Sequence, residues 1–342
     1  MESILVLTHV NESGAALTRS SLEAVTAGQQ LASRLGMTLA IGIVAADPQP
    51  AADELASAGA RLLAVSGEAF AQPRYASGAA ACEALCRAAQ ATIVLASAGS
   101  RFSRCLAGVS HRLAGVIDTH ITALSGTTSL AVTRWFYRQR IEGVFSRTAR
   151  PWFLLLETGA YPAFAGARGA ANLEQIHVQL PELRTTVIGI ESPAKDAQTI
   201  RPDAGLLFVA GAGWTKKQSD GHVHIAEAGD LILNFLRLAQ PSLGSSKSLV
   251  DQGSDGQPVL PFLTHMNQVG QTGSTPRHPR GLSTCCHGEE PHVVGWRFIG
   301  ERRAISLDPN CGWTRGKADV VYIADAFQVM SKVNALLADA KK

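Results

Sequence analysis

Short apolar runs alternate with helical stretches through the first hundred residues of the chain. Residues 4–10 form the first apolar run, which predicts a buried strand. Residues 22–35 have the spacing of an amphipathic helix, and Gly36 is placed to end it. Three further short strands are expected at 38–44, 62–65 and 92–96. Because strands and helices alternate, the pattern predicts a mostly parallel sheet.

The pattern changes near residue 120, where strand candidates follow one another with little helix between them. These candidates are residues 129–136, 140–145 and 152–157. They predict an antiparallel or mixed addition to the same sheet. Residues 186–190 are expected to form the last strand of this half. The polar stretch 191–202 contains two prolines and is expected to be a linker.

A second α/β unit begins with the apolar run 206–209. Residues 251–286 are rich in Gly, Pro, Ser and Thr, which predicts a long functional loop region. The other expected elements are a helix at 226–238, strands at 248–250, 293–299, 304–307 and 320–323, and a closing helix at 325–337. The predicted fold class is therefore α/β with two domains. Residues 1–200 would hold the mostly parallel sheet with antiparallel additions, and residues 201–342 a doubly wound unit.

Length and charge narrow the classes of function. A chain of 342 residues suits two domains, and 46% hydrophobic with 17% charged residues is ordinary for a globular α/β protein. The net charge is only +3 and no dense Lys/Arg block carries it, so nothing favours nucleic acid or a membrane surface as partner. No apolar run reaches the roughly 18–20 residues of a membrane span. We expect a cytoplasmic protein, with a processed mitochondrial chain as the alternative.

The six cysteines show no disulfide framework. Cys82 and Cys86 lie four apart in an Ala-rich helical stretch, where small buried residues are expected. Cys285, Cys286, His287 and His292 fall within eight residues, but their spacing matches no common zinc motif, so no metal site is predicted.

Glycines follow the strand expected at 206–209. Gly211 and Gly213 suit either a phosphate-binding turn or a tight strand-to-loop turn, since Lys216 holds the third glycine position of the dinucleotide fingerprint. No Ser-His-Asp order, pair of catalytic carboxylates or Walker lysine stands out, and no catalytic residue is predicted.

Two polar segments of the second half carry a family resemblance. Residues 268–273 read QVGQTG, and this string closely resembles the flavin loop of electron-transfer flavoprotein alpha subunits. Residues 244–247, Gly-Ser-Ser-Lys, resemble the family's Gly-Ala-Ser-Arg. His292 falls where the family carries its flavin-facing histidine, and Asp325 matches the aspartate that opens the last helix. The first half resembles the family more loosely, around residues 96–118 and 133–137.

The resemblance implies that residues 201–342 bind FAD. Thr272 would lie at flavin N5, His292 at the N1/C2 edge, Ser246 at the flavin or its phosphates, and Asp325 at the adenosine end. The full implied set is Ser246, Lys247, Gln268, Val269, Gly270, Gln271, Thr272, His287, Gly288, His292, Ser306 and Asp325.

The implied function is that of an electron carrier rather than an enzyme. Residues 1–200 would contact a beta-type subunit in a heterodimer. The complex would take electrons from acyl-CoA or other dehydrogenases and pass them to a quinone oxidoreductase or a similar acceptor.

Several positions depart from the family pattern. Lys247 replaces an arginine over the flavin ring, the turn at Gly213 lacks the family's arginine, and Glu289 and Glu290 add negative charge. Fewer cation contacts predict a lower flavin potential than is usual for the family. The same departures leave two alternatives open. One is a flavin-free scaffold subunit with a degenerate site, and the other is a nucleotide-dependent enzyme that uses Gly211 and Gly213.

Overall fold

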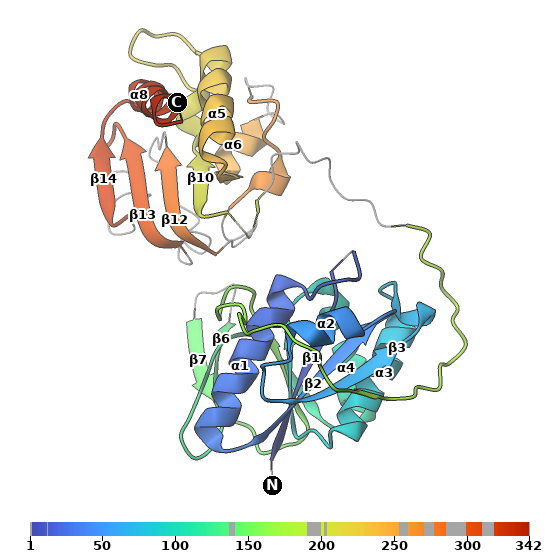
Figure 1. The fold of residues 1–342 in the computed structure, drawn as a ribbon. Helices are drawn as coiled ribbons and strands as arrows, with labels where there is room; N and C mark the ends of the chain where they lie inside the picture. Colours follow the sequence, from blue (N-terminus) through green and yellow to red (C-terminus); the bar gives the residue numbers. More distant parts are fainter. Residues whose placement is uncertain are drawn as a thin grey trace. The chain divides into compact units, whose positions relative to one another are not determined.

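A computed structural model of the chain divides it into two compact units, Met1–Glu191 and Ser192–Lys342 (Figure 1). The residues that the structure describes are 2–11, 13–136, 141–189, 200–201, 204–252, 259–269, 277–284, 299–309 and 318–341.

The first unit is built on a sheet with the strand order β7-β6-β5-β8-β4-β1-β2-β3-β9. Its strands are β1 Ser3–His9, β2 Thr38–Ala45, β3 Arg61–Ser66, β4 Ile93–Ser97, β5 Val116–Ser125, β6 Ala131–Phe136, β7 Ile141–Phe145, β8 Trp152–Leu156 and β9 Leu173–Gln175. Its helices are α1 Arg19–Leu35, α2 Gln49–Glu54, α3 Tyr75–Ala88 and α4 Ser100–Arg112, with the 3-10 turn η1 Glu68–Phe70. Only β5–β6 and β6–β7 pair antiparallel; the other described pairs are parallel.

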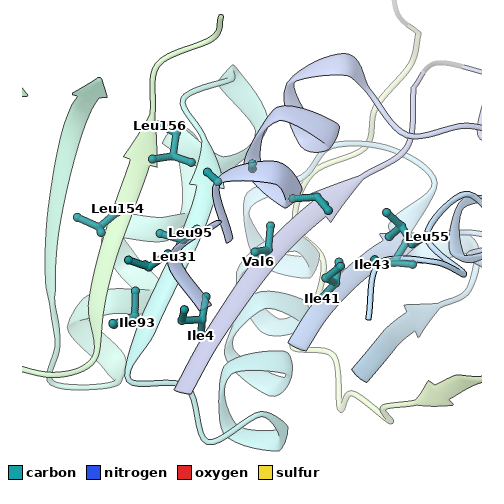
Figure 2. Close-up of a cluster of buried hydrophobic side chains, with 14 of the residues drawn as sticks. Ile4, Val6, Leu31, Ile41, Ile43, Leu55, Ile93, Leu95, Leu154 and Leu156 are labelled. Carbon is teal, nitrogen blue, oxygen red and sulfur yellow. The ribbon is translucent and has the colours of Figure 1, made fainter. Parts of the chain in front are cut away.

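Both faces of this sheet are covered, so its central strands carry apolar residues on both faces along most of their length. Ile4 and Val6 of β1 pack beneath α1 with Leu31 (Figure 2). Leu5 and Leu7 point the opposite way, into the cluster that α3 and α4 cover. Side chains of this continuous apolar run therefore pack into two hydrophobic clusters, one on each face of the sheet.

Local signals explain where α1 begins and ends. Thr18 caps its first turn, because the hydroxyl accepts a hydrogen bond from the Ser21 N–H. Gly36 ends it in the left-handed conformation, at φ 63°, as the sequence predicts.

A buried carboxylate joins β5, β6 and β8. Asp118 is 2% exposed and accepts hydrogen bonds from Arg134 Nη1 (3.1 Å), Arg147 Nη2 (2.9 Å) and Trp152 Nε1 (2.9 Å). Burial raises the Asp118 pKa, but the bonds from Arg147 and Trp152 outweigh it and hold the pKa below its usual value. The chain thus keeps this carboxylate ionised where β8 enters the sheet.

The second unit is a parallel sheet with the order β11-β10-β12-β13-β14. Its strands are β10 Leu206–Ala210, β11 Ser242–Ser245, β12 His278–Thr284, β13 Ile299–Ser306 and β14 Val320–Ile323. Its helices are α5 Ile225–Ala239, α6 Lys247–Asp251 and α8 Ala326–Asp339, with the 3-10 turns η2 Ala212–Thr215 and η4 His265–Asn267. Helices α5 and α8 pack against each other on one face (Figure 1).

The predicted fold class is confirmed: a large, mostly parallel sheet with antiparallel additions and a second, parallel sheet make a two-part α/β protein. Two expectations for the first unit are corrected, and one strand was missed. Residues 152–157 contain β8, which is parallel and lies between β4 and β5 rather than in an addition. Strand β5 was not predicted. Residues 186–189 form no strand, and β9 takes the edge beside β3.

Two expectations for the second unit are also corrected. Residues 248–250 lie in α6, because the strand of this region is β11, Ser242–Ser245, and Ser246 caps the helix that follows it. The expected loop 251–286 contains β12, whose Pro279 and Gly281 interrupt the alternating pattern that would reveal a strand. Of the strand expected at 293–299, only Ile299 is described, and it begins β13.

A pair of helical glycines tests how closely helices pack on the first sheet. An added Cβ at Gly28 in α1 would lie 2.4 Å from Val6 Cγ2, whereas one at Gly78 in α3 would meet only Cys105 Sγ, at 4.0 Å. We expect Gly28→Ala to destabilise the first unit by about 1–3 kcal/mol through overpacking. Gly78→Ala should stabilise it by about 0.5–1 kcal/mol through helix propensity. Urea unfolding of both variants measures the two effects; a neutral Gly28→Ala would contradict the packing of α1 on β1.

Candidate functional site

The carboxyl ends of the five described parallel strands of the second unit meet at one edge of the sheet. Open α/β sheets bind ligands at this edge. The strand order places β11 and β14 at its two ends, four strand spacings or about 19 Å apart. An elongated ligand, rather than a single small ring, could therefore contact residues at both ends.

Ser246 and Lys247 form the corner between β11 and α6. The Ser246 N–H donates to the Ala210 carbonyl (2.8 Å), and its hydroxyl accepts from the Leu249 N–H (3.2 Å), which caps α6. Lys247 forms an ion pair with Asp251, one turn further on. The hydrogen bond from Lys247, and then that from His265, lower the pKa of Asp251. Both side chains at this corner are thus engaged with the protein itself.

The start of the predicted flavin loop is docked against the end of β11. Gln268 bridges to Ser245, and the Val269 N–H donates to the Ser245 carbonyl (3.0 Å). Val269 is fully buried and packs with Leu207 on the face of the sheet away from α5 and α8. A Cβ at Gly244 would lie 2.5 Å from Val269 Cγ2, so this close approach needs a glycine.

Ser306 and Asp325 lie toward the other end of the same edge. Ser306 ends β13, is 1% exposed, and its hydroxyl accepts from the Asp308 N–H (3.1 Å). Asp325 follows β14 and caps α8 by accepting from the Phe327 N–H (2.8 Å). The described predicted residues therefore gather in two groups, one at β11 and one at β13 and β14.

Two buried serine hydroxyls at this edge lack a hydrogen-bond partner among the described residues. They are the Oγ atoms of Ser245 and Ser283. Ser283 pairs in register with Val209 and Ala304, so it lies on the face that also carries Val269. A buried hydroxyl without a partner costs about 1–3 kcal/mol, so such atoms are expected to meet a polar group of a ligand or of the chain.

The glycine turn after β10 is filled by the protein's own side chain. Trp214 lies in η2, is fully buried and donates from Nε1 to Thr284 Oγ1 (2.8 Å). Its ring centre lies 4.6 Å from that of Phe327. Gly211 and Gly213 are buried beneath this arrangement, which is that of a tight structural turn rather than an open phosphate cradle. Sequence reasoning missed Trp214 and Thr284, although a Trp directly after a glycine turn is a signal for such packing.

Half of the predicted site lies outside the described residues. These positions are Gly270, Gln271, Thr272, His287, Gly288 and His292, together with Cys285, Cys286, Glu289 and Glu290. The convergence of Thr272 and His292 on one flavin ring stays a prediction. Among the described residues, no group of three or more His, Cys, Asp or Glu side chains could hold a metal ion.

A comparison with protein families identifies the first unit. The model for the electron transfer flavoprotein domain matches residues 6–182, more than half of the chain. The chain therefore belongs to the electron transfer flavoprotein family, whose members are electron carriers rather than enzymes. A search of curated proteins found no match. The matched region is the first unit, where the resemblance was looser, whereas the predicted cofactor residues lie in the second.

No helix among the described residues is both long enough and apolar enough to cross a bilayer.

Ser283 and Thr284 are neighbours on β12, but only the Thr284 hydroxyl accepts a hydrogen bond from a described side chain, that of Trp214. Thr284→Val keeps the side-chain volume but leaves the buried Trp214 N–H without its acceptor, so we expect a loss of about 1–3 kcal/mol. Ser283→Ala removes a hydroxyl without a described partner and should be neutral or stabilising in the cofactor-free chain. Chemical unfolding of the two variants measures this difference; equal losses would show that Ser283 is bonded within the protein.

Proposed function

We propose that the chain is the alpha-type subunit of a heterodimeric electron transfer flavoprotein and that its second unit binds FAD. The observation that carries this proposal is the docking of Gln268 and Val269 onto the end of β11, beside Ser246 and Lys247. That contact brings together the two segments that resemble the family's flavin-binding motifs. Membership in the family supports electron transfer as the role.

The shape of the edge also suits FAD. A dinucleotide is long enough to reach from the β11 corner toward Asp325, about four strand spacings away. In this proposal, Ser246, Lys247, Gln268 and Val269 hold the flavin end, Ser306 lies between, and Asp325 lies by the adenosine. Bound FAD supplies both one-electron and two-electron chemistry, which an electron carrier needs.

The proposed partners follow from the same assignment. A beta-type subunit would contact the first unit. The electron donors would be acyl-CoA or other dehydrogenases, and the acceptor a quinone oxidoreductase or a similar protein. We propose a cytoplasmic location.

One set of observations favours the flavin-free scaffold as a second candidate. The Ser246 hydroxyl and the Asp325 carboxylate both serve as helix caps, and Lys247 is paired with Asp251. Caps and exposed ion pairs contribute only about 1 kcal/mol each, so a bound dinucleotide could redirect them at small cost.

Flavin content separates the two candidates. We expect the chain, co-expressed with a beta-type subunit, to be yellow and to release about one FAD per heterodimer on denaturation. Ser283→Ala should retain less flavin, because the Ser283 hydroxyl has no partner among the described residues and lies on the face that carries Val269. Absorbance spectra and chromatography of the released cofactor measure both. A folded, colourless heterodimer that does not take up added FAD would support the scaffold instead.

The lysine in place of the family's arginine has a testable electrochemical effect. An arginine offers a planar fork of donors, which stabilises an anionic reduced flavin better than an ammonium does. We expect Lys247→Arg to raise the flavin potential by on the order of 30 mV, about one charge-assisted hydrogen bond for a two-electron couple. Reductive titration with a reference dye measures it. Lys332→Arg, at an exposed position on α8, is the control, and an equal response would count against a contact between Lys247 and the flavin.

A further inference from the structure

A buried asparagine lies directly before the segment that resembles the family's flavin loop. Asn267 is 2% exposed and ends the 3-10 turn η4. The resemblance in sequence begins at Gln268, so Asn267 is not among the predicted cofactor residues. Because a buried amide side chain needs hydrogen-bond partners, the partners of Asn267 show which parts of the chain it holds together.

Both ends of the Asn267 side chain are bonded to main-chain groups. Its Oδ1 accepts a hydrogen bond from the Thr264 N–H (3.1 Å), and its Nδ2 donates to the Leu243 carbonyl (3.3 Å). The opposite orientation of the amide would set two donors against each other at Thr264 and two acceptors at Leu243. Asn267 therefore links its own turn to strand β11 in one fixed orientation.

Both segments that Asn267 links are anchored in the same hydrophobic cluster. Leu243 of β11 is 1% exposed and packs in the cluster that also contains Phe208 and Phe235. Leu260, shortly before Thr264 in the chain, is 2% exposed and belongs to this cluster as well. The side-chain amide thus joins two backbone segments that the core already holds in place.

Together, Asn267 and Val269 contact β11 as a neighbouring strand would. Strand β11 lies at one end of the described sheet, and β10 pairs along one of its sides. Carbonyls two residues apart on a strand point to the same side. Here the Leu243 carbonyl accepts from Asn267 Nδ2 and the Ser245 carbonyl accepts from the Val269 N–H (3.0 Å). The side chain of Asn267 therefore takes the place of a backbone N–H in a short parallel ladder.

A second contact of the same turn is weaker. His265 Nε2 lies 2.9 Å from Asp251 Oδ1, and Asp251 also pairs with Lys247. The His265 side chain is 63% exposed, and exposed ion pairs contribute little to stability. A buried hydrogen bond contributes more, because its loss leaves main-chain groups without that partner. The position of the turn therefore depends on Asn267 more than on His265.

We propose that Asn267 is a positioning residue for the flavin loop and that it acts through Gln268 and Val269. By holding η4 on β11, Asn267 sets where the chain enters the loop, and so how the loop meets the cofactor. Both ends of its side chain are engaged within the protein, so its effect on the cofactor is indirect. This role rests on the proposed binding of FAD by the second unit.

Asn267→Ala in the proposed heterodimer tests this role. The variant removes both hydrogen bonds, so we expect FAD to dissociate about tenfold faster, which is the effect of about one buried hydrogen bond. The visible circular dichroism of the remaining bound flavin should also differ from that of the wild type, because the loop meets the ring differently.

A second buried asparagine provides a matched control. Asn334 on α8 is 4% exposed, and its Nδ2 donates to the Leu231 carbonyl of α5 (2.9 Å). Asn334→Ala should lower the stability of the second unit but keep the wild-type rate of FAD dissociation and the wild-type flavin spectrum. Equal changes in the two variants would show a general effect of stability and would overturn the proposal.

Asn267→Asp separates the two hydrogen bonds. A carboxylate can still accept from the Thr264 N–H but cannot donate to the Leu243 carbonyl, whereas a protonated carboxyl can do both. Burial would raise the pKa of the new carboxyl. Relative to wild type at the same pH, we expect fast FAD dissociation at about pH 8 and recovery toward about pH 5.5. A ratio to wild type that does not change with pH would contradict the contact with Leu243.

Hydrogen exchange of the flavin-free chain distinguishes a failure of this role from a failure of the proposed function. Asn267→Ala should speed exchange of the Val269 amide by about tenfold while the amides of α5 and α8 stay unchanged. Unchanged exchange at Val269 would overturn the role of Asn267. A wild-type heterodimer that takes up no FAD, with Val269 exchange still faster in the variant, would instead contradict the proposed function and with it the link to flavin.

Discussion

The contact between the end of β11 and the segment at Gln268 is the constraint on which the second unit's site depends. The Val269 N–H donates to the Ser245 carbonyl and the Asn267 side-chain amide donates to the Leu243 carbonyl, while a glycine at 244 leaves room for the Val269 side chain. A larger residue at 244 would push the segment away from the strand. Because β11 has only four residues, its end, the cap of α6 and the start of the loop lie within one small region. Two motifs some twenty residues apart in the sequence thus become neighbours.

The two units make different contributions to the account. The first unit carries the family match, and its core is fixed by β1, whose side chains alternate between the cluster under α1 and the cluster under α3 and α4. The second unit offers the edge of parallel strands with buried hydroxyls and the family-like segments. The family match establishes the class of protein, whereas the cofactor assignment depends on the geometry of the second unit.

The sequence predicted the elements that have strong local signals. Helix α1, which Gly36 ends, and the buried strands β1 to β4 follow from periodicity and this C-terminal glycine. Strand β5 was missed because polar residues, Asp118 and His120 among them, interrupt its apolar pattern. The reason for Asp118 is tertiary: its partners Arg147 and Trp152 come from residues about thirty positions away. Strand β12 was missed for a local reason, since Pro279 and Gly281 resemble loop residues.

The candidate site was likewise predicted from the sequence only in part. A resemblance in sequence named Ser246, Lys247, Gln268 and Val269, and the structure brings these four together. The sequence resemblance could not reveal that Ser246 and Asp325 also cap helices or that Trp214 fills the glycine turn, because these contacts depend on the fold of the whole unit.

Hydrogen–deuterium exchange of the proposed heterodimer with and without FAD tests the central claim most directly. The account predicts that FAD protects the amides at the end of β11, in α6 and around Gln268, and those at the start of α8, while exchange in the first unit's β1 to β4 is unchanged. Protection confined to the first unit, or unchanged exchange at the β11 corner in a flavin-loaded sample, would contradict it.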